Sequence, residues 1–267
     1  MSKKAITVLV MLVLFVAAIV NDKIHWSKKV ANATAQTNEV KTTKTKVENN
    51  KTNKEEKQDA KVSFNEAYAK NLPDAVKEKL KKAAEDKKAV NLVIVGDEAS
   101  SPAKDAWLSK FVSNLDASYG KGLWNVTVKE YKNESTEELI ANKRAQDIGK
   151  AKPDVILFEA PFITDNNKRG NGNSVVNTQK FVGELSSSAK DATIMIQPPN
   201  PVYGAENYPK AVQALKQNGY AYVDHWEAWP NATTKEILPY LQEEFSFPNA
   251  KGYDVWAQYV TNYFVAK

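Results

Sequence analysis

Two hydrophobic patterns alternate along the chain from residue 63 onward. Five short runs of buried type predict strands at Ala89–Val95, Trp124–Tyr131, Pro153–Glu159, Ala192–Gln197 and Tyr220–Asp224. Residues at helical spacing predict helices over Phe64–Lys88 with an interruption at Pro73, Pro102–Tyr119, Ser135–Gly149, Ser174–Lys190, Ala205–Asn218, Thr233–Glu243 and Ala250–Ala266. Strands that alternate with helices form parallel sheets covered on both faces. The pattern therefore predicts a three-layer α/β/α domain over residues 63–267, with a five-stranded, mostly parallel sheet.

The first 62 residues follow a different pattern. Ala5–Val20 is an unbroken apolar run after Lys3 and Lys4, which is typical of a signal peptide or an uncleaved signal anchor. Small residues suited to cleavage lie far beyond this run, which favours an anchor within residues 1–30. Residues 31–62 lack aromatic residues and are too polar to offset their ordering entropy. We expect a disordered tether that holds an extracytoplasmic domain at a single-pass membrane anchor, or a secreted domain if the signal is cleaved.

The composition disfavours several classes of function. The absence of Cys excludes disulfides and a Cys nucleophile, and the only two His residues, His25 and His225, disfavour a multi-His metal centre. We expect neither a metal nor a cofactor. Net charge is +5, but only Arg144 and Arg169 supply guanidinium groups, on which nucleic-acid recognition relies. The Lys excess therefore predicts no nucleic-acid partner; it fits a solvated surface or attraction to anionic envelope polymers.

Polar residues gather where the predicted strands end. The loops Gly96–Pro102, Glu159–Asn173, Gln197–Tyr203 and Asp224–Pro230 all follow strands of the predicted parallel sheet. In such sheets ligands bind beyond the carboxyl ends of the strands. We expect the functional site at this edge of the sheet, where several carboxylates could perform acid–base chemistry.

Short motifs in these loops resemble the SGNH or GDSL-type esterase superfamily. The motifs are Gly96-Asp97 after the first strand, Pro153–Glu159 followed by Thr164-Asp165-Asn166, and Phe247-Pro248-Asn249-x-x-Gly252 near the C-terminus. The resemblance spans roughly residues 89–264. It implies a flavodoxin-like sheet, lipase or acylhydrolase chemistry through a serine acyl-enzyme, and Asn166 as an oxyanion donor.

Two further segments, Gln197–Pro201 and Asp224–Pro230, resemble a surface-anchored, hydrolase-like branch of that superfamily. The chain also departs from the family pattern. The family nucleophile follows Gly-Asp, where this chain has Glu98, and the family His falls on Phe247. These departures leave two hypotheses open, a displaced catalytic triad or a non-catalytic domain.

A displaced triad would use Ser100 or Ser101 as the nucleophile and His225 as the general base. Asp97 or Glu227 would then orient the imidazole ring, and Asn166 would stabilise the oxyanion. The structural alternatives are a helix-capping role for Ser100 and a hydrogen-bonded structural role for His225.

Five residues around these positions are candidates for substrate binding, because carboxylates, hydroxyls and indole rings suit sugar rings: Glu98, Ser101, Asp165, Trp226 and Trp229. The sequence thus predicts a hydrolase of ester groups on cell-envelope polysaccharide or on an acylated small molecule. The alternative is an inactive SGNH-like domain that binds a glycan or another envelope partner.

Overall fold

The computed structural model describes residues 64–103, 106–205, 208–217, 219–244 and 246–266. The predicted anchor within residues 1–30 and the predicted tether over 31–62 lie outside these residues. Within the described ranges, no helix has the length and apolar character needed to cross a membrane.

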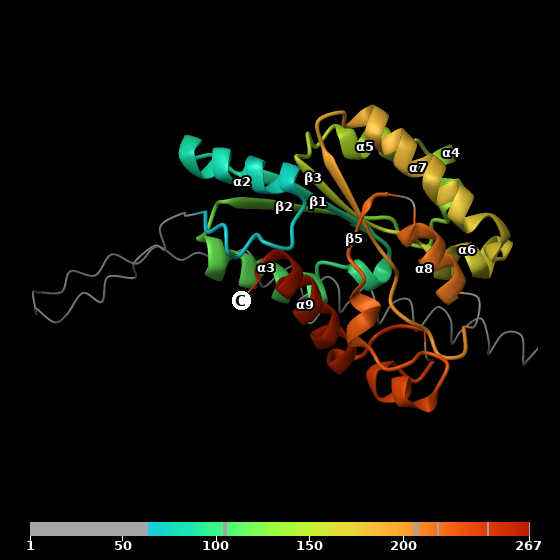
Figure 1. Cartoon of the computed structure of the whole chain (residues 1–267). Helices are drawn as coiled ribbons and strands as arrows, with labels where there is room; N and C mark the ends of the chain where they lie inside the picture. The colour runs from blue at the N-terminus through green and yellow to red at the C-terminus, as the bar shows by residue number, and fades with distance from the viewer. Residues whose placement is uncertain (1–63, 104–105, 206–207, 218, 245, 267) are drawn as a thin grey trace, which may run out of the picture. The chain divides into compact units, whose positions relative to one another are not determined.

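The centre of the domain is a five-stranded sheet (Figure 1). Its strands are β1 (Val90–Gly96), β2 (Trp124–Glu130), β3 (Val155–Glu159), β4 (Thr193–Gln197) and β5 (Ala221–Tyr222). The spatial order is β2-β1-β3-β4-β5, and every neighbouring pair is parallel. This is the flavodoxin-like order of doubly wound α/β folds, so the predicted fold class is confirmed.

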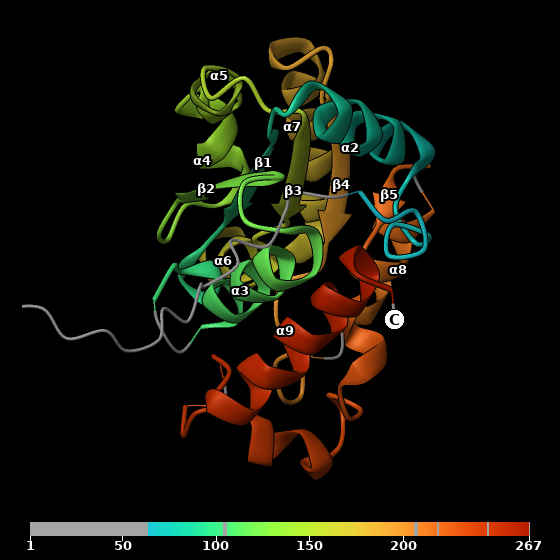
Figure 2. The same cartoon turned by 90° about the vertical axis from the view of Figure 1, so that its left-hand side faces the viewer.

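Helices cover both faces of this sheet (Figures 1 and 2). One face packs against α2 (Asp74–Asp86), α3 (Trp107–Tyr119) and α9 (Ala250–Phe264). The other face packs against α4 (Thr136–Ala141), α5 (Arg144–Gly149), α6 (Phe162–Arg169), α7 (Ser174–Ser188) and α8 (Tyr208–Lys216). The domain therefore has the three predicted layers.

Alternation along the central strands divides the core into two clusters. In β3, Val155 and Leu157 face the α3 and α9 layer, whereas Ile156 and Phe158 face the opposite layer. Side chains of a strand point alternately to the two faces, so Glu159 points toward α3 and α9. Gln197 pairs in register with Glu159 on the neighbouring strand and shares its face. Two polar side chains thus end the hydrophobic strands on the same side of the sheet.

Several predicted helix boundaries are wrong. The helix predicted over Ser135–Gly149 is divided into α4 and α5, because Lys143 adopts the left-handed conformation with φ of 54°. The segment Thr233–Glu243 forms only a 3-10 helix, Lys235–Tyr240, which contains Pro239. The predicted loop Glu159–Asn173 contains α6. The helix expected from Pro102 begins at Trp107.

The Pro-Asn-x-x-Gly motif shapes the start of α9. The Asn249 side chain accepts hydrogen bonds from the backbone N–H groups of Lys251 and Gly252, at 3.0 and 3.2 Å. Its amide nitrogen donates to the carbonyl groups of Pro239 and Leu241. One side chain therefore caps the helix and holds the preceding segment against it.

Replacing Gly252 should destabilise the domain, because a Cβ at this position would clash with the carbonyl oxygen of Tyr240. We expect Gly252→Ala to lower the free energy of unfolding by about 1–3 kcal/mol in urea denaturation. Gly183 is a matched control, since it lies on the exposed side of α7 with open space around it. Gly183→Ala should raise stability by roughly 0.5–1 kcal/mol. Equal effects of the two substitutions would contradict this interpretation.

Candidate functional site

The carboxyl ends of β1 and β3 lie at the point where the strand order reverses. The chain passes from β1 outward to β2 and then returns to β3 on the other side of β1. At such a switch point the loops after the two strands diverge and leave a crevice, where doubly wound folds bind their ligands. Asp97 follows β1 directly, and Glu159 is the last residue of β3.

A short 3-10 turn, Glu98–Ser100, directs Ser100 into the protein. The Asp97 side chain caps this turn by accepting a hydrogen bond of 2.8 Å from the backbone N–H of Ala99. The Ser100 side chain is fully buried, its hydroxyl contacts the Glu159 carboxyl group, and it accepts the indole N–H of Trp107 at 3.1 Å. Gly96 permits this packing, because a Cβ there would lie 2.5 Å from a Glu159 oxygen.

Burial disfavours the charged forms of the two carboxyl groups. Desolvation raises the pKa of Asp97 to about 6, and the hydrogen bond from Ala99 only partly opposes this shift. Desolvation, with the negative charge of Asp97 beside it, raises the pKa of Glu159 well above its ordinary value. The neighbouring phenol of Tyr253 has its pKa raised to about 12, first by desolvation and then by these carboxylates. The charged form of Glu159 is therefore strongly disfavoured at the end of β3.

Asp97→Asn should change the pH dependence of stability. The pKa of Asp97 rises from 3.8 to about 6 on folding, so the folded state binds more protons between these values and loses stability as the pH rises through that window. The amide retains an acceptor for Ala99 but carries no charge. We expect the free energy of unfolding of Asp97→Asn to exceed that of the wild type by about 1–3 kcal/mol at pH 8, with a smaller difference at pH 4. An equal difference at both pH values in urea titrations would contradict the raised pKa.

His225 is fully buried, and both of its ring nitrogens have partners. Nε2 lies 2.9 Å from the carbonyl oxygen of Pro198, and Nδ1 accepts the indole N–H of Trp229 at 3.1 Å. These contacts require the neutral tautomer with its proton on Nε2. The ring also stacks on Trp256 of α9, with centroids 4.3 Å apart and planes inclined by 15°. Desolvation lowers the pKa of His225 to about 3 despite the opposing hydrogen bond to Pro198.

The imidazole of His225 should therefore remain neutral across the physiological range. In a full-length chain carrying His25→Gln, one imidazole is left, and its Cε1–H resonance can be followed by NMR. We expect no titration between pH 8 and pH 5, because burial disfavours the imidazolium form. A midpoint near pH 6.5 would show an accessible ring and contradict the closed geometry.

The predicted pairing of Ser100 with His225 is not present. Ser100 is bonded to Glu159 and Trp107, whereas His225 is bonded to Pro198 and Trp229. The Asp97 carboxylate caps its own turn and does not orient the imidazole. The structure thus does not bring Ser100 and His225 together, and the contacts of His225 are those of a hydrogen-bonded structural residue.

Asp165 and Asn166 lie on α6. Asp165 is buried and accepts hydrogen bonds from the backbone N–H and the hydroxyl of Thr136, at 2.6 and 2.8 Å, so it fixes the start of α4. Burial raises its pKa, which these hydrogen bonds oppose. Asn166 is exposed, and its side chain interacts with Tyr208. Asp165 therefore has a structural role at the start of α4, and the substrate-binding role expected for it stays a prediction.

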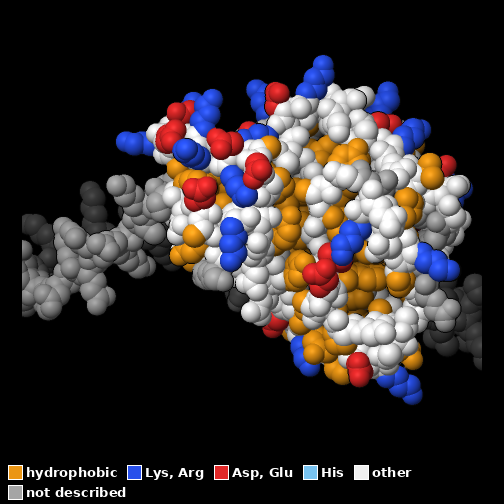
Figure 3. All heavy atoms as spheres, viewed as in Figure 1, with side chains coloured by type: hydrophobic (Ala, Val, Ile, Leu, Met, Phe, Trp, Pro, Cys, Tyr) orange, Lys and Arg blue, Asp and Glu red, His pale blue; other side chains and the backbone are white. Residues whose placement is uncertain are grey.

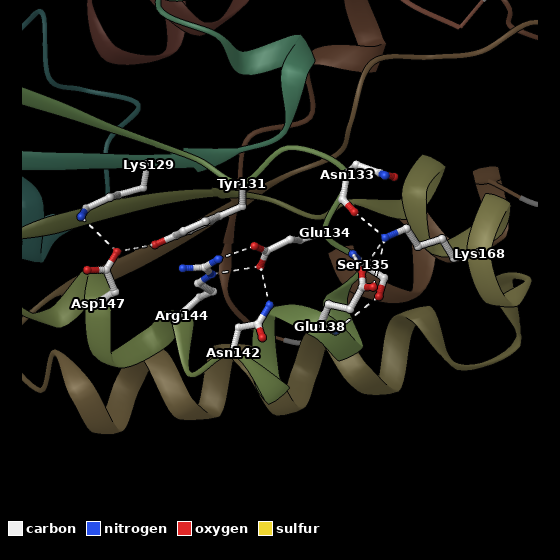
Figure 4. Close-up of polar contacts among 10 residues, drawn as sticks. All are labelled: Lys129, Tyr131, Asn133, Glu134, Ser135, Glu138, Asn142, Arg144, Asp147 and Lys168. Carbon is white, nitrogen blue, oxygen red and sulfur yellow. Dashed lines mark hydrogen bonds and ion pairs between the residues drawn. The ribbon is translucent and has the colours of Figure 1, made fainter.

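Ion pairs hold the loop between β2 and α4 at this edge of the sheet (Figure 4). Arg144 binds Glu134 through two guanidinium nitrogens and lies over the ring of Tyr131, 4.8 Å from its centroid. Lys168 of α6 contacts Glu138 at 2.8 Å. Ser135 and Glu138 form a capping box at the start of α4. Charged side chains in this loop are thus occupied by one another and serve to position the loop.

Comparisons with known proteins identify the fold. No protein-family model and no curated protein sequence matches the chain. Solved structures do match. A G-D-S-L family protein from Desulfitobacterium hafniense, described as lipolytic, has 16% identity and a TM-score of 0.51, covering 65% of this chain and 99% of its own. An acetyl-xylooligosaccharide esterase from Geobacillus stearothermophilus has 15% identity and a TM-score of 0.53, covering 66% and 94%. A carbohydrate esterase family 3 protein from Talaromyces cellulolyticus has 13% identity and a TM-score of 0.53, covering 64% and 94%.

The domain has the SGNH hydrolase fold. This confirms the predicted resemblance at the level of the fold. In the SGNH pattern the nucleophile position is Glu98, which is half-buried beside Asp97, and Ser101, also half-buried, follows the turn. The His position is Phe247, which packs against the hydrophobic cluster under α3 and α9. Among the described residues, no group of three or more His, Asp or Glu side chains is arranged to hold a metal ion.

Trp226 and Trp229 lie in and after the 3-10 turn His225–Ala228, which follows β5. Trp226 is half-buried and donates its indole N–H to the carbonyl of Pro199 at 2.7 Å. The buried Trp229 donates to His225. Both rings line a pocket of about 140 Å³. The prediction that these residues bind substrate is untested, but the pocket gives their rings a surface for a ligand.

Sequence reasoning missed several residues that lie around the carboxyl ends of the central strands. Glu159 was expected only as one of several acidic residues, and the contributions of Trp107, Gln197 and Tyr253 were not anticipated. The available signal was the strand alternation, which places Glu159 and Gln197 on the α3 side. Gln197 accepts the indole N–H of Trp256 at 3.3 Å. This hydrogen bond links the end of β4 to α9, whose Trp256 stacks on His225.

Proposed function

We propose that this SGNH-fold domain binds a carbohydrate of the cell envelope without hydrolysing its ester groups. We further propose that the N-terminal 62 residues hold it on the outer side of a membrane. The observation that carries the proposal is the state of His225, whose two ring nitrogens are both bonded within the core. The remaining support comes from Glu98 and Phe247, which occupy the positions of the family nucleophile and the family His, and from the pocket lined by Trp226 and Trp229.

Serine acyl transfer needs a base that takes the hydroxyl proton. Burial lowers the pKa of His225 to about 3, and the ring would lose both of its hydrogen bonds on moving to a serine. Phe247 stands where the family places its His, and a phenyl ring accepts no proton. Neither residue can therefore act as the general base of an acyl-enzyme reaction in this geometry.

The surroundings of Ser100 and Glu98 also disfavour serine acyl transfer. Ser100 is buried and faces Glu159, so its hydroxyl is directed away from solvent. Glu98 brings a carboxylate to the position of the family nucleophile. A negative charge there would repel the oxyanion that forms when an ester carbonyl is attacked, whereas hydrolases place donors at that point. These features oppose hydrolysis.

Three observations support an envelope carbohydrate as the ligand. Structures with this fold include an acetyl-xylooligosaccharide esterase and a carbohydrate esterase. The pocket at Trp226 offers aromatic and proline surfaces of the kind that pack on sugar rings. The apolar run Ala5–Val20 and the polar residues 31–62 are typical of a tethered surface protein, and the net charge of +5 favours an anionic envelope.

The full chain in detergent micelles, mixed with an acetylated xylo-oligosaccharide, distinguishes binding from hydrolysis. We expect calorimetry to detect binding, and we expect no acetate release and no fluorophosphonate adduct in the intact mass, because no base can activate a serine. The Geobacillus stearothermophilus esterase serves as the positive control for both readouts. Acetate release or an adduct that disappears in Ser100→Ala or Ser101→Ala would overturn the proposal.

A further inference from the structure

A small pocket with aromatic and proline walls lies beyond the carboxyl ends of β4 and β5. Pro201, Pro209 and Pro230 form its walls together with Trp226 and Trp229. Its volume is about 140 Å³. An apolar cavity of about 150 Å³ holds one benzene molecule, so this pocket has the capacity for a single six-membered ring. In Figure 3 hydrophobic side chains reach the surface in this part of the molecule, over the segment that follows β5.

The two indole rings are held in place before any ligand arrives. Trp226 is bonded to Pro199, and Trp229 is bonded to His225, which is itself bonded to Pro198 and stacked on Trp256. Both indole N–H groups are thereby used within the protein. The ligand therefore meets ring surfaces and not indole donors, which favours a partner with an apolar face. Preorganised rings also reduce the entropy lost on binding.

The mouth of the pocket carries one polar group with unused donors. Asn231 is exposed, and its side-chain oxygen accepts hydrogen bonds of 2.9 Å from the backbone N–H and the hydroxyl of Thr233. No hydrogen bond within the described part of the chain uses its Nδ2. The backbone carbonyl of Ala232 accepts the N–H of Gly204 at 3.0 Å, which ties this turn to the loop after β4. The amide is therefore fixed with two N–H donors available.

We infer that this pocket binds the apolar face of one sugar ring in a neutral oligosaccharide, with the Asn231 amide donating to a ring hydroxyl oxygen. The inference rests on the proposed function and names its binding subsite. A pyranose has an apolar face bordered by hydroxyl acceptors, which matches indole and proline walls beside an amide donor. A proline-rich peptide fits less well, because its carbonyl groups would find no indole N–H donor in this pocket. His225 acts here as a positioning residue, because its neutral ring holds Trp229.

The test compares four forms of the full chain in detergent micelles: the wild type, Trp226→Ala, Asn231→Asp and Val176→Ala. Asn231→Asp retains the oxygen that accepts from Thr233 but loses both N–H donors. Val176 is an exposed hydrophobic residue of α7 and serves as the surface control. The probes are unacetylated oligomers of xylose, glucose and N-acetylglucosamine, and a proline-rich decapeptide. Calorimetry gives the affinities, and saturation-transfer NMR identifies the sugar protons in contact.

We expect at least one oligomer to bind with saturation transfer to the C–H protons of one ring. Its affinity should fall at least tenfold in Trp226→Ala and in Asn231→Asp, and it should be unchanged in Val176→Ala. Asn231→Asp keeps the test decisive if Trp226→Ala fails to fold. An oligosaccharide that binds the two variants as tightly as the wild type would overturn the subsite while the proposed function stands. Binding of the peptide alone, or of none of these oligomers at millimolar concentration, would also overturn it. Ester hydrolysis would instead refute the proposed function.

Discussion

The neutral imidazole of His225 connects three parts of the domain that the sheet alone does not hold together. Its Nε2 donates to the loop after β4, its Nδ1 accepts from Trp229 beyond β5, and its face stacks on Trp256 of α9. The contact with Trp229 requires an unprotonated ring, because only a free Nδ1 can accept the indole N–H. A general base must take up a proton during every turnover, and a proton on Nδ1 would break this hydrogen bond, whereas the bond to Pro198 and the stacking on Trp256 are compatible with either form of the ring. The hydrogen bonds of the loops at this edge of the sheet therefore favour a structural role for the same ring.

The carboxyl groups at the ends of β1 and β3 impose a second constraint. Asp97 and Glu159 lie in the core side of the crevice, where desolvation disfavours their charged forms. Such a pair lowers stability at neutral pH, yet Asp97 also caps the turn that directs Ser100 inward. The turn therefore determines two features together: it removes a hydroxyl from solvent, and it presents Glu98 in place of the family nucleophile. A single local conformation thus sets the positions of both Ser100 and Glu98 on this side of the fold.

The fold was predictable because buried strands carry a strong hydrophobic signal, and Val155–Glu159 and Thr193–Gln197 are examples. The predictions for two segments with weaker hydrophobic patterns were wrong for identifiable reasons. Pro239 and short length reduce residues 233–243 to a 3-10 helix, and α6 has few apolar residues to distinguish it from a loop. The loops of the site were also predictable from parallel topology. The directions of the Ser100 and His225 side chains were not predictable. They depend on a three-residue turn and on stacking with a tryptophan 31 positions later in the chain.

The strand order has a consequence for association of the folding chain. Within the part of the chain that the structure describes, the outermost strands β2 and β5 each pair on one side only, and exposed strand edges are where chains add to one another. β5 contains only two residues, so it offers little backbone to a second molecule. β2 is seven residues long, and its hydrophobic residues Val126 and Val128 are partly exposed. Lys129 on this strand is paired with Asp147, which leaves a charged contact at the edge that another chain would have to displace. Unwanted self-association would therefore begin at β2, on the side of the domain away from the aromatic pocket.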